Sequence, residues 1–180
     1  MRQIVLLRGI NLGPHNRIAM PALRELLTDA GYREVQTYVQ SGNIVVETRK
    51  AAATVADECA RLIAERFGLD IPVVTRTAAE LAEVVRRNPL GDATDDPKRY
   101  QVSFLSAKPD PAVVAKVAAL AVGDERFAAV GRELYAWHPA GVARSKLAVA
   151  VAGKALGVTA TARNWTTVEA LLALAAPTDT

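Results

Sequence analysis

The chain has few of the residues that build redox-active or metal-binding sites. Cys59 is the only cysteine among 180 residues, so no disulfide can form within the chain and a reducing compartment is expected. His15 and His138 are the only histidines, and we expect both to be solvated. Two histidines and one cysteine cannot build a zinc or iron–sulfur site by themselves. We therefore expect no metal and no cofactor.

Long apolar or charged runs are missing as well. The first apolar run ends at Arg8, which is too short for the core of a signal peptide, and no later stretch is long enough to span a bilayer. The net charge of +3 is small and dispersed, without a run of five like charges. These absences predict a cytoplasmic protein with no membrane contact.

Motifs of common nucleotide-binding and hydrolytic enzymes are absent too. Gly153-Lys154 lacks the upstream glycine and the following Ser or Thr of a P-loop. Gly9 and Gly13 follow the first strand with the wrong spacing for a dinucleotide fingerprint, and no nucleophile elbow surrounds Ser41. A hydrolase triad therefore has no support in the sequence.

Aromatic residues make up only 5% of the chain, and the RNP1 pattern of RNA-recognition sheets is missing. Tyr135 and Trp137 do share one face of a predicted strand, as base-stacking residues would. A core position between sheet and helices explains them better.

The elements that are present follow one order twice. In the first half we expect strands at 4–7, 35–40, 43–47 and 71–75 and helices at 21–30 and 51–67, with Ser41-Gly42 as a hairpin turn. The run at 4–7 is continuously apolar, which indicates burial on both faces. Gly31 and Gly68 close the two helices, and Cys59 lies on the core face of the second.

A connecting helix leads to a loop at 88–99 that is rich in Pro, Gly and Asp, and the order then repeats. We expect strands at 100–105, 126–130, 133–138 and 158–163, and helices at 111–122, between Ser145 and Gly157, and at 167–175. The segment 147–152 also fits a strand, but its two caps favour a helix.

This β-α-β-β-α-β order predicts an α+β fold of two successive ferredoxin-like subdomains with an extra C-terminal helix. The predicted bounds are 1–87 for the first subdomain with its connecting helix, 88–99 for a linker and 100–180 for the second.

Two polar segments lie where a strand ends beside the start of a helix. The first contains Arg8, Asn11 and Asn16, and the second contains the run Arg163-Asn164-Trp165-Thr166-Thr167. Free backbone N–H groups at such junctions favour anions, and an arginine adds a fixed positive charge. Turns and caps explain the same residues without a ligand: Asn11 suits a left-handed turn, and Thr166 with Glu169 matches a capping box.

Two shorter segments complete the set of candidate binding residues. The turn with Ser41 and Asn43 has a sufficient structural explanation. Arg144-Ser145-Lys146 places two cations around a possible helix N-cap, which suits a phosphate group.

Several of these segments carry a family resemblance. The runs Leu-Leu-Arg-Gly-Ile-Asn at 6–11, Thr-Tyr-Val-Gln-Ser-Gly-Asn at 37–43, Arg-Ser-Lys-Leu at 144–147 and Thr-Ala-Arg-Asn-Trp-Thr-Thr at 161–167, with Met20, occur in order. In these runs the chain resembles the uncharacterised bacterial family called domain of unknown function 1697. The resemblance implies two ferredoxin-like subdomains and brings no established activity. Gly13-Pro14 replaces the usual Gly-Gly, and Thr166 replaces the usual Asn.

Our leading hypothesis is a binding protein for a small anion, a nucleotide or a nucleic-acid backbone. The alternative is a small metal-independent enzyme acting on a phosphorylated or carboxylated metabolite. In it, Arg8 and Arg163 would stabilise charge and His15 or Asp95 would carry protons. A third possibility is a structural protein whose polar motifs are paired internally.

Overall fold

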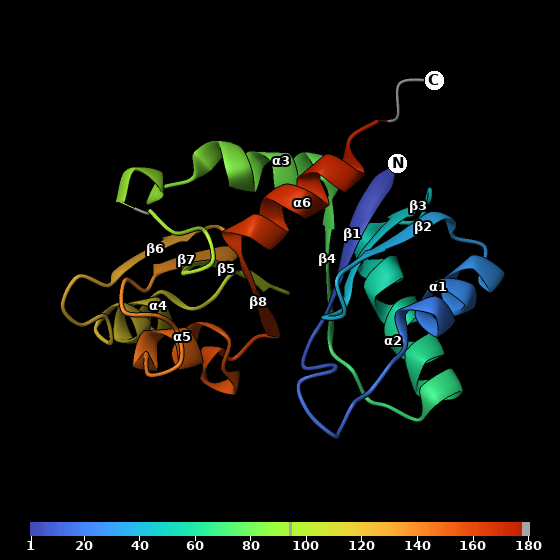
Figure 1. Cartoon of the computed structure of the whole chain (residues 1–180), viewed down its shortest axis with the longest axis horizontal. Helices are drawn as coiled ribbons and strands as arrows, with labels where there is room; N and C mark the ends of the chain where they lie inside the picture. Colours follow the sequence, from blue (N-terminus) through green and yellow to red (C-terminus); the bar gives the residue numbers. More distant parts are fainter. Residues whose placement is uncertain (94, 178–180) are drawn as a thin grey trace. The chain divides into compact units, whose positions relative to one another are not determined.

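The computed structural model describes residues 1–93 and 95–177 (Figure 1). Grouped by contacts, the chain forms two compact units, Met1–Glu83 with Glu169–Thr180 and Val84–Val168, called unit 1 and unit 2 below. The bounds predicted from the sequence differ from these, because they place the last helix in the second subdomain, directly after the strand that precedes it. Where the chain separates into independently folding parts stays a prediction.

Unit 1 is built on a four-stranded antiparallel sheet with the strand order β2-β3-β1-β4. Its elements in chain order are β1 (Arg2–Leu7), α1 (Met20–Asp29), β2 (Arg33–Tyr38), β3 (Asn43–Glu47), α2 (Ala52–Phe67), β4 (Val73–Thr77) and α3 (Ala78–Arg87), which continues into unit 2. The predicted element order is confirmed. Strands β2 and β4 are each displaced by about two residues from their predicted bounds.

Unit 2 repeats this plan with the strand order β6-β7-β5-β8. Its elements are η1 (Gly91–Ala93), β5 (Tyr100–Leu105), α4 (Pro111–Ala118), β6 (Arg126–Val130), β7 (Glu133–Trp137), α5 (Lys146–Val151), η2 (Lys154–Leu156), β8 (Ala160–Asn164) and α6 (Trp165–Ala175), which continues into unit 1. The ambiguous segment 147–152 is helical, but α5 is shorter than expected and a separate 3₁₀ turn precedes Gly157. The α+β fold of two ferredoxin-like halves is confirmed.

The core of unit 1 lies between the sheet and two helices. Helices α1 and α2 lie beside each other against this sheet (Figure 1). Val5 and Leu7 of β1 belong to one buried cluster with Leu23 of α1 and Cys59 of α2. Ile4 of the same strand has no exposed surface either, so β1 is buried on both faces, as the continuous apolar run predicts. Burial raises the pKa of the Cys59 thiol to about 12, which makes Cys59 an unreactive core residue.

Helix caps account for several of the polar residues at element junctions. Gly68 ends α2 with a left-handed φ of 66°. Thr77 and Glu80 form a reciprocal capping box at the start of α3: the Glu80 amide donates to Thr77 Oγ1 at 3.2 Å, and the Thr77 amide donates to Glu80 Oε2 at 2.8 Å. The box predicted at Thr166 and Glu169 is wrong, because α6 begins earlier, at Trp165.

The two sheets share one register. Gln3 of β1 lies opposite Thr77, and Gln101 of β5 lies opposite Asn164, so each glutamine faces the last residue of the final strand of its own sheet. The hairpin turns match as well: the Leu7 amide donates to the Gly42 carbonyl and the Leu105 amide to that of Arg132, both at 2.9 Å. The ladders of β1 and β5 therefore correspond position by position, whereas the β2–β3 ladder has a shift between Arg33 and Gln36 that the β6–β7 ladder lacks.

Candidate functional site

Asn11 fixes the loop that follows β1. Its backbone is left-handed, with φ of 54°. Its Nδ2 donates to the Ile18 carbonyl at 2.9 Å and to the Gln40 carbonyl at 2.7 Å, and its Oδ1 accepts from the Ile18 amide at 2.9 Å. The side chain thus joins the β1–α1 connection, residues 8–19, to the β2–β3 turn, residues 39–42. We call these two segments together the loop end of unit 1.

Three other predicted residues lie at this end of the sheet. Asn16 Nδ2 donates to the Gly9 carbonyl at 3.3 Å, and the Asn16 carbonyl accepts from the Asn11 amide at 3.0 Å. Asn43 is fully buried, and its Nδ2 donates to Ser41 Oγ at 2.9 Å. The structure therefore brings Arg8, Asn11, Asn16, Ser41 and Asn43 to one end of unit 1, where the asparagine amides are occupied by contacts within the loops.

The outer surface of the loop end is cationic and partly apolar. His15 and Arg17 are exposed and Arg8 is partly buried, and neither segment contains an acidic residue. Leu12 and Val39 are 83% and 55% exposed. The α2–β4 connection lies beside them, since the Arg8 amide donates to the Pro72 carbonyl at 3.0 Å, and it carries the exposed Asp70.

Val39 is in a backbone conformation that its side chain disfavours. Its φ is 49°, in the left-handed region that β-branched residues rarely occupy. Such a residue costs on the order of 1–3 kcal/mol and persists only where its surroundings impose the conformation. The clamp from Asn11 to the neighbouring Gln40 carbonyl supplies that constraint. Strain of this kind clusters at functional sites.

We expect Val39→Asn to stabilise the chain by about 1 kcal/mol, because asparagine tolerates left-handed φ and the exposed valine loses little packing. The free energy of unfolding from urea titration measures the effect. Val122→Asn is the matched control, since Val122 is 67% exposed and is not among the residues with positive φ. An equal gain in the free energy of unfolding in both variants would show that the loss of an exposed valine, and not the relief of strain at position 39, causes the stabilisation.

The second polar segment makes its side-chain contacts within unit 2. Asn164 Oδ1 accepts from the Thr167 amide at 2.9 Å and so caps α6. Arg163 Nη1 donates to Thr161 Oγ1 at 2.6 Å and to the Ala162 carbonyl at 2.9 Å, and burial lowers the pKa of this arginine to about 10. Trp165 stacks on Tyr100 with ring centroids 4.9 Å apart. These contacts support a structural role for the segment.

Ser145 takes part in a buried network. It is the N-cap of α5, where its Oγ accepts from the Ala148 amide at 3.0 Å, and it also donates to Glu125 Oε1. His138 Nδ1 lies 3.1 Å from the same carboxylate oxygen and 3.0 Å from Ser145 Oγ. An ionised carboxylate only accepts hydrogen bonds, so Nδ1 of His138 carries a proton.

The solvated position expected for His138 is wrong. The side chain has no exposed surface, and its Nε2 is buried without a hydrogen-bond partner. His15, for which the same position was expected, is exposed.

Glu125 and Ser145 of this network also line a cleft of about 610 Å³ between residues 122–125 and 139–145. Arg144 and Ser145 line it with Asp124 and Glu125, whereas Lys146 is exposed beside it. Burial acts to raise the pKa of Glu125, but hydrogen bonds from Ser145, His138 and the Val122 amide outweigh it and leave the pKa below its ordinary value. The carboxylate is therefore ionised in the folded protein at neutral pH.

Metal-ligand clusters and membrane-spanning helices are both absent from the residues that the structure describes. Within residues 1–93 and 95–177 no three His, Cys, Asp or Glu side chains gather as metal ligands would. None of the helices in those residues is long and apolar enough to cross a membrane.

Comparison with known proteins supports the fold and the family. The model of a family of proteins of unknown function, DUF1697, matches residues 1–135. The chain belongs to the DUF1697 family. A solved structure of the conserved bacterial protein SP0830 from Streptococcus pneumoniae is similar in fold, with a TM-score of 0.79 and 20% identity, over 97% of this chain and 98% of that one. No curated protein matches the sequence.

The DUF1697 match covers the whole loop end of unit 1 and ends before Arg144 and Arg163. Membership in DUF1697 thus identifies the chain without assigning a ligand to either unit. Two features of the structure were not predicted from the sequence. The His138 network joins Glu125 of the α4–β6 connection to His138 and Ser145 of the β7–α5 connection. The strain at Val39 arises at a residue type that gives no turn signal.

Proposed function

We propose that the chain is a binding protein whose loop end of unit 1 recognises a phosphate-bearing ligand, either a nucleotide or a nucleic-acid backbone. The observation that carries the proposal is that Asn11 joins two segments that hold Arg8 and Arg17 and no carboxylate. Arg17 is exposed, so its charge can reach a ligand.

The fixed loop geometry supports binding, because a ligand does not then have to order the loop. Three hydrogen bonds of Asn11 and one of Asn16 hold residues 9–18 in place. Ordering a flexible loop on binding weakens affinity, and a loop that is already ordered avoids that cost. The exposed Leu12 and Val39 add apolar surface that suits a base or sugar face.

The number of cations limits what this surface can bind. Each neutralised phosphate of single-stranded nucleic acid contributes about −0.7 to the slope of log affinity against log salt. One contact by Arg17 predicts a slope of about −0.7, and a second contact by Arg8 would bring it to about −1.4, which is still modest. A nucleotide or a short single-stranded segment therefore fits this end better than a long duplex.

The test is fluorescence anisotropy of a labelled single-stranded oligonucleotide between 50 and 200 mM salt, with thermal-shift assays of nucleoside triphosphate and inorganic phosphate alongside. We expect Arg17→Ala to weaken binding by about tenfold, the value of one charged contact. Asn11→Ala is expected to weaken it as well by releasing the loop. The two assays separate a nucleic-acid ligand from a free nucleotide.

Arg49→Ala is the matched control, because Arg49 is an exposed arginine of unit 1 that follows β3 at the opposite end of the sheet. It should bind like the wild type. Equal losses in the Arg17 and Arg49 variants would indicate a general charge effect, and no response to any of the three ligands would overturn the proposal.

A small enzyme is the second candidate, and the cleft of about 610 Å³ in unit 2 favours it. There Arg144 would hold the phosphate or carboxylate of a metabolite, and Ser145 and Glu125 would supply polar groups. Both oxygens of Glu125 already accept hydrogen bonds, which limits its use as a base. If the chain is such an enzyme, Arg144→Ala should abolish turnover, whereas Arg8→Ala and Arg163→Ala should leave turnover unchanged.

A further inference from the structure

The position in unit 2 that corresponds to the loop end of unit 1 holds a pocket. In both units a connection from the first strand to the first helix meets the hairpin turn of the two following strands. In unit 1 these are residues 8–19 and 39–42, and in unit 2 they are residues 106–110 and the turn at Gly131. Lys108, Pro109 and Gly131 line a cavity of about 220 Å³ there.

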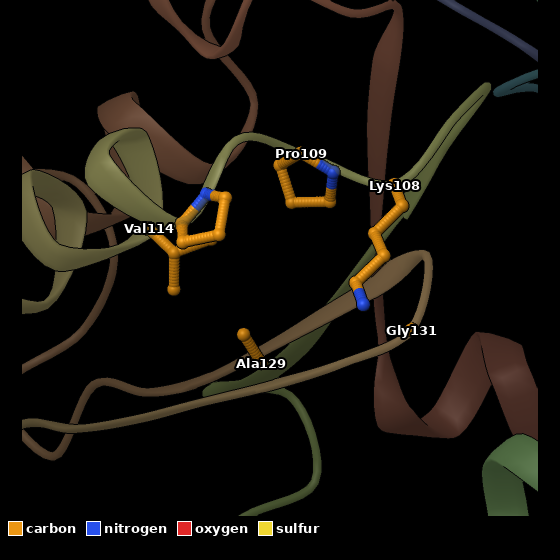
Figure 2. Close-up of a pocket in the computed structure, with 6 residues that line it drawn as sticks. Lys108, Pro109, Val114, Ala129 and Gly131 are labelled. Carbon is orange, nitrogen blue, oxygen red and sulfur yellow. The ribbon is translucent and has the colours of Figure 1, made fainter.

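The walls of the pocket are apolar apart from one cation. The remaining lining residues are Pro111 and Val114, from the first turns of α4, and Ala129 of β6. Figure 2 shows the Lys108 side chain reaching toward the Gly131 turn, with Pro109 and Val114 facing Ala129 across the space. Lys108 is thus the one charged residue among the six that line the cavity.

The pocket is open because its connection is short. In unit 1 the longer connection folds back, and Asn11 fastens it to the Gln40 carbonyl. In unit 2 the chain passes directly from β5 into α4, and Asp110 caps that helix by accepting from the Ala112 amide at 2.7 Å. That bond directs the nearest carboxylate on the connection to the helix backbone.

We propose that this pocket binds a small carboxylate with an apolar body, such as a short fatty acid or an aromatic acid. The apolar walls would hold the hydrocarbon part, and Lys108 would pair with the carboxylate. A volume of 220 Å³ is below the range of about 300–1,000 Å³ of pockets for drug-sized ligands, so the ligand has to be small. Two prolines in the wall restrict the backbone and keep the pocket formed in the free protein.

Amide chemical shifts of the full-length chain, recorded during titration with hexanoate and benzoate, test the proposal. We expect shifts confined to residues near 108–114 and 129–131. Hexanol has the same apolar chain without charge and should bind about tenfold or more weakly, and hexylamine should not bind there, because its charge repels Lys108.

Three variants distinguish the site from general surface binding. Lys108→Met keeps an apolar stem but removes the charge, and it should lower the affinity for hexanoate about tenfold. Ala129→Leu fills the pocket from an exposed edge-strand position and should abolish binding of both acids. Lys116→Met is the control, because Lys116 is an exposed lysine of α4 outside the pocket, and it should leave affinity unchanged.

The proposal would be overturned by equal affinity for hexanoate and hexanol, or by chemical-shift changes spread over other parts of the chain. Identical affinities of the Lys108 and Lys116 variants would also overturn it. The site shares no residue with the loop end of unit 1. A failure here therefore leaves the phosphate-binding proposal untouched, and the reverse also holds.

Discussion

Gly42→Ala is expected to lower the free energy of unfolding by about 2–5 kcal/mol, through two separate effects. Gly42 has a φ of 75°, and a side chain in this region costs about 1–2 kcal/mol. A methyl group there would also lie 2.6 Å from Cβ of Leu7, which is fully buried in the core. Overpacking of this kind costs typically another 1–3 kcal/mol, because the core has to shift.

Two other glycines separate these effects. Gly68 has a φ of 66° and open space where a methyl group would lie, so Gly68→Ala should show the backbone cost alone. Gly13 has neither a positive φ nor a neighbour within 4 Å of that position, so Gly13→Ala should be nearly neutral. A Gly42 variant no less stable than the Gly68 variant would contradict the close approach to Leu7.

The choice of probe matters in this measurement. The two tryptophans, Trp137 and Trp165, both belong to unit 2, so their fluorescence reports on the wrong unit for Gly42. Urea unfolding of the Gly42 variant should therefore be followed by far-UV circular dichroism. A difference between the two probes would also show whether the units unfold separately.

Glu125→Ala is expected to destabilise unit 2 by about 1–3 kcal/mol, the usual cost of leaving a buried donor without its acceptor. The substitution removes the acceptor of Ser145 Oγ and of the Val122 amide, and it leaves Ser145 Oγ as the remaining neighbour of His138 Nδ1. His138 has no exposed surface, so water does not replace the lost contact without rearrangement. Urea titration followed by tryptophan fluorescence measures the loss.

The loss of stability in the Glu125→Ala variant should depend on pH. The pKa of Glu125 is lowered in the folded protein, so its stabilising effect is complete above the ordinary value of 4.5 and is lost as the pH falls through the lower folded value. The difference in stability between wild type and Glu125→Ala should therefore be largest at neutral pH and smaller near pH 3. Glu65→Ala is the control, since the Arg61–Glu65 pair is exposed and worth little. A difference that is constant from pH 7 to pH 3 would show that Glu125 acts through packing alone.

Periodicity and caps were enough to predict the architecture. The apolar run of β1, the glycine stops after α1 and α2 and the Ser145 cap of α5 each reflect interactions between residues close in sequence, which is why a single sequence reveals them. Strand ends were less certain. At β4 the predicted strand stops at Thr75, but the ladder opposite Gln3 continues to Thr77.

The capping box of α3 shows a signal that was present and overlooked. Thr77 and Glu80 have the spacing of the motif and stand directly before apolar residues at helical spacing. Placing the strand end two residues early left Thr77 outside any expected helix start. The error in β4 and the missed cap therefore have the same origin.

The candidate site was predictable only in part. The sequence singled out the polar residues of the loop end as two separate segments, because each flanks a strand end, but it did not predict that these segments meet. It gave no indication of the His138 network, which depends on contacts among residues 125, 138 and 145. Nor did it indicate the pocket at Lys108, which exists because a neighbouring connection is short.

The matching registers of the two sheets turn each half into a template for engineering the other. The segment between β1 and α1 runs from residue 8 to 19, whereas its counterpart between β5 and α4 runs only from 106 to 110. Transplanting the shorter segment onto the first sheet would delete Asn11 and its clamp while keeping the strand and helix that it joins. Such a chimera would test whether the first sheet tolerates the shorter connection, and whether ligand preference changes with the transplanted segment.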